Sequence, residues 1–470
     1  MRTRSVCVMV ILSAGCLGQM AASNTTVPES SDSTKPPTSD STKPPTSDMP
    51  QSPTSDMPQP VAATICNGNC YYVTQAGSGS KSGADWNNAY AGLPSSFVRD
   101  ATYFVAGGTY GSHTFSTPAS STSVITIKKA VVADHGTSTG WSDTMGSTQA
   151  IFGQFLFLSS YWVVDGQVGD GASVAPADAT PADYGFAFSE HVAPITIGDT
   201  VGPSYTDFTF KHIYALATTS DVQKEFLMTG YQIAQANNIT ISHCMMDGWQ
   251  GAMFANGQGG ATDSNWIFEY NIALNASSTP ANHGEWIDPN DAPLSGLIVR
   301  YNIFKGHSGV GGATGSIVAN NSPNTSAIIY GNVFDSVEVG NGIITGTSVA
   351  KMINATVYNN TFLNVASVSG PWVNGPGSGN IASNNLLYNM AAAPGSGWTC
   401  DYDAFFSTSG TPSEAHGETG SGDPFTDAAN MNYTLKANTT PGLSVGSAYN
   451  VDPLGHMRST WTRGAFEFTP

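Results

Sequence analysis

A short phrase of alternating apolar and polar positions returns several times between Asn265 and Asn389. In each copy a few alternating residues lead to an asparagine, and an apolar pair follows it. The two-residue period predicts a β-strand, and the asparagine predicts a turn before a second short strand. The copies are Trp266–Leu274, Leu297–Lys305, Ala327–Asp335 and Ala355–Leu363, with a weaker copy at Ile381–Leu387.

Aligning the copies places one asparagine of each in a single column: Asn271, Asn302, Asn332, Asn360 and Asn385. Neighbouring members are 31, 30, 28 and 25 residues apart. A repeat of about 20 to 50 residues indicates a solenoid or a propeller. One strong strand per copy is too few for a four-stranded propeller blade. We therefore predict an all-β fold, a parallel β-helix whose coils stack about 4.8 Å apart.

The asparagine column has a physical explanation in such a stack. A side-chain amide can donate to the coil on one side and accept from the coil on the other, so the column predicts a buried hydrogen-bond ladder. The alternative is that these residues only form turns. The apolar pair that follows each asparagine favours the ladder, and both interpretations make the column structural.

The alignment also predicts which side chains face outward. Two positions before the asparagines stand Glu269, Arg300, Tyr330 and Tyr358, and extending the column backwards adds Lys211 and Ser242. The adjacent positions are apolar and have the opposite, inward parity. We expect Glu269 and Arg300 to pair across neighbouring coils. This pair is either a surface ion pair of small energetic value or part of a substrate clamp.

The composition limits the partners. Charged residues make up only 11% of the 470 residues, and the formal net charge is −18. Such a charge argues against nucleic acid or an anionic membrane as a partner. It also disfavours long-range attraction of an acidic polysaccharide, unless a local basic site or a bound cation intervenes.

The N-terminal region predicts export. Residues 1–23 have a basic start, a short apolar stretch and small residues, as in a signal peptide, and the stretch is too short to span a membrane. Cys16 stands in a sequence similar to a bacterial lipobox, which gives lipid anchoring as an alternative to free secretion. Residues 24–64 are rich in Pro, Ser and Thr and predict an extended, disordered linker. Residues 65–470 then form one ordered domain, which we expect to be a monomer.

Three further features concern the start and core of this domain. Cys66 and Cys70 flank Asn-Gly-Asn, and in an exported chain this spacing favours a local disulfide. Cys244 aligns with the asparagine column and is expected to be buried. The segment Trp86–Leu93 is expected to be a short helix that caps the open end of the solenoid.

The phrases YYVTQAGSGSKSG after Cys70 and VAGGTYG at Val105–Gly111 and the ending GAFEF at Gly464–Phe468, together with the repeats, resemble secreted right-handed parallel β-helix proteins of the pectin-lyase-like superfamily. The resemblance covers about Tyr71 to Pro470. It implies a right-handed helix that acts on uronate polysaccharides by β-elimination. That reaction needs neutralisation of a carboxylate, for which the family implies Ca²⁺, and two proton transfers.

A cluster of polar residues interrupts the repeat at Asn282–Asp291, in the sequence NHGEWIDPND. Its segment resembles a glutamate-containing strand of the alginate-lyase and chondroitinase-B type, in which the glutamate binds Ca²⁺ and a nearby lysine abstracts the proton. This implies Glu285 as a Ca²⁺ ligand. The cluster itself offers Asp288 as a second candidate metal ligand, Glu285 as an alternative base, and His283 or the downstream His307 as the proton donor. The chain departs from that pattern because no lysine stands between Glu285 and Arg300, and GSIVANN replaces the expected Arg-His pair. A hydrogen-bonded turn with incidental acids is the alternative.

We predict a polysaccharide-active protein of the lyase type, with a non-catalytic carbohydrate-binding or adhesive surface protein as the alternative. The candidate catalytic residues are His283, Glu285, Arg300 and Lys305, and the candidate substrate-binding residues are Glu269, Trp286, His307 and Tyr330. The lyase hypothesis requires the catalytic four to meet in one open groove. An inverting glycosidase would need two carboxylates about 6.5–9.5 Å apart, and no compact acid motif indicates one. No GxSxG motif supports a serine hydrolase.

Overall fold

The computed structural model describes most of the chain from Cys66 onward. The described residues are 66, 68–167, 178–189, 193–199, 201–217, 224–230, 232–249, 251–254, 262–276, 285–288, 293–307, 317–319, 324–339, 344–346, 351–367, 377–390, 397–411 and 413–470. The predicted signal peptide, lipid anchor and linker all lie outside them, so these three remain predictions. Among the described residues, no helix is long and apolar enough to cross a membrane.

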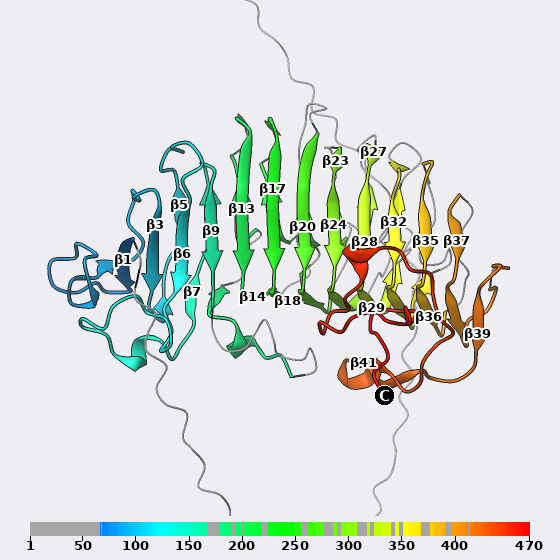
Figure 1. Cartoon of the computed structure of the whole chain (residues 1–470). Coiled ribbons are helices and arrows are strands. Elements are labelled where there is room, and N and C mark those ends of the chain that lie inside the picture. The colour runs from blue at the N-terminus through cyan, green and yellow to red at the C-terminus, as the bar shows by residue number, and fades with distance from the viewer. Residues whose placement is uncertain are drawn as a thin grey trace, which may run out of the picture. The chain divides into compact units, whose positions relative to one another are not determined.

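Three parallel sheets run along the domain (Figure 1). The long sheet has fourteen strands within the described residues. In stacking order they are β2 (Tyr90–Ala91), β1 (Asn69–Thr74), β3 (Ala101–Val105), β6 (Ile125–Lys129), β9 (Trp162–Asp165), β13 (Tyr205–Lys211), β17 (Ala236–Ser242), β20 (Asp263–Glu269), β24 (Leu297–Arg300), β28 (Ala327–Tyr330), β32 (Thr356–Tyr358), β35 (Ile381–Ser383) and β37 (Thr399–Asp401), with β23 (Leu294–Ser295) also paired to β20.

The other two sheets complete the coils. The second sheet contains β4 (Gly108–Thr109), β7 (Ala150–Phe152), β10 (Phe186–Phe188), β14 (Ile213–Leu216), β18 (Met245–Asp247), β21 (Ile272–Leu274), β25 (Ile303–His307), β29 (Val333–Val339), β33 (Thr361–Leu363), β36 (Leu386–Tyr388), β38 (Ala404–Phe406) and β39 (Glu418–Gly420), with β34 (Ala366–Ser367) beside β29. The third sheet contains β5 (His113–Phe115), β8 (Phe155–Phe157), β11 (Ile195–Ile197), β15 (Glu225–Thr229), β19 (Gly251–Phe254), β22 (Ile287–Asp288), β26 (Ile317–Ala319) and β30 (Ile344–Gly346).

Short elements connect or flank these sheets. Two small parallel pairs join neighbouring coils. One antiparallel pair lies in the C-terminal segment, which is the chain after β39, residues 421–470. They are β12 (Val201–Gly202) with β16 (Gln232–Ile233), β27 (Asn324–Thr325) with β31 (Lys351–Met352), and β40 (Phe425–Asp427) with β41 (Asn432–Leu435). The described helices are all single 3₁₀ turns: η1 (Trp86–Asn88), η2 (Asp143–Met145), η3 (Pro181–Asp183), η4 (Ala428–Asn430) and η5 (Ser447–Tyr449).

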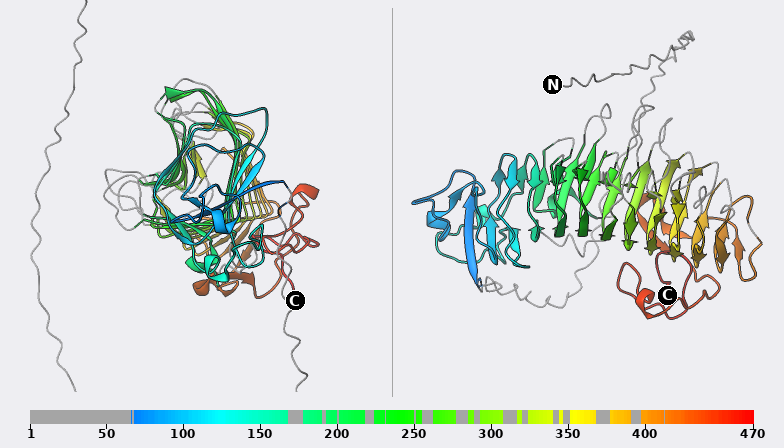
Figure 2. Two further views of the ribbon diagram at one scale, coloured as in Figure 1. Left: turned by 90° about the vertical axis from the view of Figure 1, so that its left-hand side faces the viewer. Right: turned by 90° about the horizontal axis from the view of Figure 1, so that it is seen from above.

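Each central coil visits the three sheets in turn. β13 leads to β14 in the second sheet and then to β15 in the third, and the next coil repeats the path through β17, β18 and β19. Successive coils superpose when viewed along the stack (Figure 2). The chain is therefore a right-handed parallel β-helix, as the repeats and the resemblance predicted.

The predicted asparagine ladder lies at the corner between the long and second sheets. The Oδ1 atom of Asn302 accepts from both the backbone N–H and the Nδ2 of Asn271, at 2.9 and 3.0 Å. The same double contact recurs from Asn302 to Asn332, from Asn332 to Asn360, and from Asn360 to Asn385. Each amide group therefore binds coils on both sides, and the ladder fixes the coil-to-coil register.

A single residue with positive φ turns the chain at each of these corners. The residues at this position include His212, His243, Tyr270 and Tyr301, with φ between 52° and 61°. Non-glycine residues seldom adopt this conformation. Where a ladder residue follows one of them, it is hydrogen-bonded to the next coil, and this contact stabilises the turn. The ladder begins where the Cys244 N–H donates to Asn271 Oδ1 at 2.8 Å, and Cys244 is fully buried, as predicted.

The core consists of inward side chains stacked along the axis. Phe304, Phe334 and Phe362 lie on successive coils with nearly parallel rings 4.9 and 5.0 Å apart. Identical side chains can stack in this way because the register repeats without slipping between neighbouring coils.

The N-terminal cap differs from the expected helix. Trp86 starts only a three-residue 3₁₀ turn, and its ring packs against Tyr72 and Trp141. The following strand β2 forms the first edge of the long sheet, so this segment covers the open end as a strand and a turn. Cys66 and Cys70 form the predicted disulfide beside it.

We predict that Asn332→Ala lowers the free energy of unfolding by roughly 2–4 kcal/mol, because it removes the ladder bonds to Asn302 and Val299 and leaves the buried Asn302 N–H without its acceptor. The melting temperature of the purified chain measures the loss. Asn87→Ala is the control, since Asn87 is exposed and lies outside the ladder, and this substitution should change the free energy of unfolding by no more than about 0.5 kcal/mol. Equal losses in the two variants would contradict the ladder's role.

Candidate functional site on the outer face of the long sheet

Three rows of side chains point outward from the long sheet, because inward and outward residues alternate along each strand. In β13 the inward residues Phe208 and Phe210 are buried, and Asp207, Thr209 and Lys211 lie on the opposite face. The same pattern repeats in β17 and β20. Strand pairing therefore places equivalent residues of neighbouring coils side by side.

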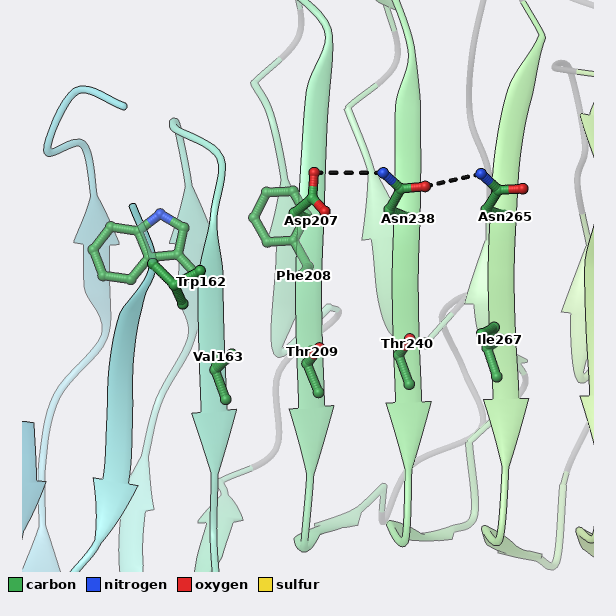
Figure 3. Close-up of a pocket in the computed structure, with 10 residues that line it drawn as sticks. Trp162, Val163, Asp207, Phe208, Thr209, Asn238, Thr240, Asn265 and Ile267 are labelled. Carbon is green, nitrogen blue, oxygen red and sulfur yellow. Dashed lines mark hydrogen bonds between the residues drawn. The ribbon is translucent and has the colours of Figure 1, made fainter. Parts of the chain in front are cut away.

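The first row is a ladder of polar side chains at positive φ. Asn265 Nδ2 donates to Asn238 Oδ1 at 2.9 Å, and Asn238 Nδ2 donates to Asp207 at 3.4 Å (Figure 3). All three have φ between 53° and 64° inside a strand, a conformation for which Asn and Asp are enriched. These kinks aim the three polar side chains along one edge of the face.

The second row forms an apolar and hydroxyl-bearing floor. Val163, Thr209, Thr240 and Ile267 are paired in register on successive coils. Figure 3 shows them in a line beside the polar row. A hollow of about 310 Å³ lies over this floor and reaches from Val124 to Ile267. Four strands, β9, β13, β17 and β20, line it, and they span about 14 Å at the usual strand spacing.

The third row is the charged column predicted from the sequence. Pairing places Lys211 beside Ser242, Ser242 beside Glu269, and Glu269 beside Arg300. Arg300 Nε donates to Glu269 at 2.7 Å, and Arg300 Nη1 donates to the Tyr330 hydroxyl at 2.9 Å. The predicted pair between neighbouring coils is confirmed.

The cations on this face are neutralised by local acids. Within the described part of the face, Lys211 pairs with Asp165 at 3.1 Å, and Lys128 pairs with Asp134. Burial alone would raise the pKa of Asp165, but the His212 hydrogen bond and the Lys211 charge outweigh it and lower that pKa. Burial alone would lower the pKa of Arg300, but its hydrogen bonds to Tyr330 and Glu269 outweigh burial and raise that pKa. These paired charges leave the row close to neutral.

The corner residues add an aromatic ridge beside the charged row. The His243 ring stacks on Tyr270 at 4.8 Å, and Tyr270 lies 4.9 Å from Tyr301. Burial, with smaller contributions from His212 and Lys211, lowers the pKa of His243 to about 4. His243 is therefore a neutral side chain that packs within the ridge and contacts the Ser242 hydroxyl at 2.6 Å.

The C-terminal segment closes one end of this face. Tyr449 packs edge-on against Tyr330 and Tyr358, and the Tyr301 hydroxyl donates to the Val451 carbonyl at 3.1 Å. The segment, red in Figure 1, crosses β28. Tyr330 is consequently buried, so it supports Arg300 and presents no free ring to a substrate.

The predicted catalytic residues come from three different sheets. Glu285 stands two residues before β22 of the third sheet, Arg300 ends β24 of the long sheet, and Lys305 lies in β25 of the second sheet. Lys305 pairs with Asp335 at 3.1 Å and donates to the Ala428 carbonyl of the C-terminal segment. Glu285 is only 5% exposed, and His283 lies outside the described residues. The expectation of one open groove is therefore wrong for Glu285, Arg300 and Lys305.

Two predicted substrate-binding residues belong to the core. Trp286 is 0% exposed and packs against Phe304 and His307. His307 is 1% exposed, and burial lowers its pKa to about 4. The prediction was wrong for both residues because side chains buried in the core cannot contact a substrate; inward and outward positions do not alternate strictly at Trp286, since its neighbour Ile287 is buried as well.

Glu285 and Asp288 do not form a calcium centre with other described residues. Calcium takes six to eight oxygen ligands. The described residues contain one group of three ligand-type side chains close enough for a single ion, formed by Cys400, Asp403 and Glu414. The described surroundings of Glu285 and Asp288 therefore do not fit Ca²⁺, and we derive no chemistry through it.

Comparisons with known proteins identify solved structures of low similarity. No family model and no curated protein matches the chain. The pectate lyase Pel9A structure has 12% identity and a TM-score of 0.42, with 86% of this chain and 98% of that chain covered. The alginate lyase from Paenibacillus sp. str. FPU-7 has 12% identity and a TM-score of 0.41, covering 75% and 98%. The PL6 family alginate lyase AlyGC has 11% identity and a TM-score of 0.33, covering 79% and 56%. The fold assignment rests on the strand pairing of this chain itself.

The sequence reasoning missed the polar row Asp207, Asn238 and Asn265. A signal was present, because each stands four positions before a member of the charged column and they are separated by 31 and 27 residues. A second in-register polar column would have predicted a second ladder.

We predict that the core imidazole of His307 makes the fold sensitive to acid. Its pKa falls from an ordinary value near 6.5 to about 4 on folding, so the unfolded chain takes up the proton first. The stability that depends on a neutral His307 is therefore fully present above about pH 6.5, and it is lost as the pH falls towards 4. The melting temperature of His307→Leu minus that of the unchanged chain should therefore become more positive when the pH is lowered from 8 to 5. The comparison at pH 8 is the control, since both chains are then neutral at this position. A difference that is the same at both pH values would contradict this.

Proposed function

We propose that this protein binds an extended, neutral polysaccharide along the outer face of its long sheet. The observation that carries the proposal is the hollow over Val163, Thr209, Thr240 and Ile267, which runs across successive coils between two polar rows. A sugar chain presents the same combination, with apolar ring faces and hydroxyl groups at its edges. The floor suits the ring faces, and the two rows suit the hydroxyls.

The coil spacing supports a linear glycan as the occupant. Coils repeat about every 4.8 Å along the stack, and a pyranose unit in an extended β-1,4-linked chain advances by nearly the same length. Consecutive sugars would therefore meet equivalent donors and acceptors, such as the Asn238 and Asn265 amides. Such polar groups fix orientation, and the apolar floor supplies most of the affinity.

The charges favour a neutral glycan over a uronate chain. Lys211 and Arg300 are both held in ion pairs with neighbouring acids, so binding a uronate carboxylate would require one of these pairs to break. The protein as a whole carries a formal charge of −18, which repels polyanions at long range. Asp207 adds a further acid at the edge of the hollow.

Cleavage by β-elimination is less well supported than binding. A lyase needs a group that neutralises the uronate, a base and an acid around one sugar. The described candidates Glu285, Arg300 and Lys305 lie on separate sheets. Paired acids and cations also suit a rigid binding surface better than proton transfer.

We predict that Ile267→Glu weakens glycan binding at least tenfold, because it puts a charge into the apolar floor; tenfold corresponds to about 1.4 kcal/mol. Calorimetric titration with cellohexaose, mannohexaose and xylohexaose measures the affinity. Leu216→Glu is the matched control, since Leu216 is an exposed apolar residue on the second sheet, and it should bind like the unchanged chain.

Acidic hexasaccharides of galacturonate and mannuronate form the second arm of this experiment. We expect weaker binding than for the neutral glycans and no unsaturated uronate product. Formation of that product by the unchanged chain would overturn the binding-only proposal in favour of a lyase. Equal weakening in Ile267→Glu and Leu216→Glu would place the glycan elsewhere.

A further inference from the structure

The asparagine ladder ends on an acid. Asp403 occupies the position that follows Asn385, and its Oδ1 accepts from the Asn385 N–H and Nδ2 at 2.7 and 3.0 Å. In earlier rungs the other side-chain atom is an Nδ2 that donates to a carbonyl, as Asn385 donates to Val357. Asp403 has an oxygen there instead. This last rung can therefore accept from the ladder but cannot donate onward as an asparagine does.

The second oxygen of Asp403 faces a small group of ligand-type side chains. One ligand atom each from Cys400, Asp403 and Glu414 lies within 4.8 Å of the others. Asp403 is fully buried, and neither its Oδ2 nor Glu414 Oε1 accepts a hydrogen bond from an N–H or O–H donor among the described residues, so the two carboxyl groups can contact each other only through a shared proton or cation. A buried, unpartnered carboxylate oxygen is costly unless a proton or a cation neutralises it.

The surrounding contacts hold this group in place. The Asp403 N–H donates to Glu414 Oε2 at 2.9 Å, which fixes the loop carrying Glu414 against the ladder. Arg463 Nη1 donates to the Asp403 carbonyl at 2.9 Å, and its Nη2 donates to the His416 carbonyl at 2.8 Å. Burial and the mutual repulsion of the two acids raise the pKa of Asp403 well above its ordinary range.

The charges and donor atoms select the kind of cation. A Cys400 thiolate and two carboxylates carry three negative charges, and the nearest cation, Arg463, already pairs with Glu418 at 3.8 Å, so a divalent ion is the charge that best neutralises the group. A sulfur ligand with two carboxylates suits Zn²⁺, which binds Cys, His and Asp or Glu in four-coordinate sites. Calcium and magnesium take oxygen ligands only.

We propose that Cys400, Asp403 and Glu414 form a zinc site that fastens the last coils of the solenoid. The ion joins the end of the long sheet at Cys400 to the ladder at Asp403 and to the loop before β39 at Glu414. Water completes the tetrahedral set, since Cys400 is only partly buried. Zinc binding releases the thiol proton and any proton shared by the carboxylates. The site is independent of the proposed glycan surface.

The first test uses the full purified chain, stripped of metal with a chelator and then dialysed. Zn²⁺ at about a hundred times its dissociation constant should raise the melting temperature by roughly 4 °C, and Ca²⁺ should not. Co²⁺ should give an absorption band from the cobalt–thiolate bond with one ion per chain. Absence of both the zinc shift and the cobalt band in the unchanged chain would overturn the proposal, because the acids then share only a proton.

Two variants locate the ion. Asp403→Asn keeps the ladder acceptor and matches the other rungs, so it should fold and lose at least tenfold in zinc affinity. Cys400→Ser should lose the cobalt–thiolate band while Cys244 remains. Unchanged zinc affinity in Asp403→Asn, or a surviving band in Cys400→Ser, would assign the ion to another place and contradict the site.

Discussion

The structure depends on the hydrogen-bond ladder at the corner between the long and second sheets. Each asparagine amide ties its own coil to both neighbours, as Asn302 does with Asn271 and Asn332. Because these bonds tolerate no slip, every coil enters its turn in the same register. Stacked aromatic rings such as Phe304 and Phe334 follow from that register on the inside of the helix. The rows on the outer face follow from it in the same way.

The proposed binding surface is a consequence of this regularity. A row of equivalent side chains is a periodic set of contacts, which matches a periodic ligand better than a small molecule. The kinks at Asp207, Asn238 and Asn265 aim polar groups along one edge, and the ion pairs of Lys211 and Arg300 line the other. The C-terminal segment ends the face at Tyr330. Several of the few charged residues in this chain thus form local ion pairs, and these pairs make the surface nearly neutral and rigid.

Local repetition made much of this architecture predictable from the sequence. The asparagine column predicted the ladder, the outward row with Arg300, and the burial of Cys244, because each depends only on the position relative to one fixed turn. The grouping of Glu285 with Arg300 and Lys305 failed for a different reason. These residues are close in sequence, but less than one coil of a three-sided helix already carries the chain from one sheet to the next two.

Irregular stretches resisted prediction because no repeat constrains them. Trp286 next to the third sheet and His307 in the second sheet are buried in the core. Inward and outward positions do not alternate regularly there, so the sequence pattern did not show which way these side chains point. The contact of Tyr449 with Tyr330 joins segments more than a hundred residues apart, and no local pattern signals it. Asp403 could be read as one more turn residue until the structure placed it at the end of the ladder.

A crystal structure of the full chain with bound cellohexaose tests the central claim most directly. The account predicts sugar rings over Thr240 and Ile267, with hydroxyl groups within hydrogen-bond distance of the Asn238 or Asn265 amide. Sugar bound instead along the third sheet beside Asp288, with the outer face of the long sheet bare, would contradict it.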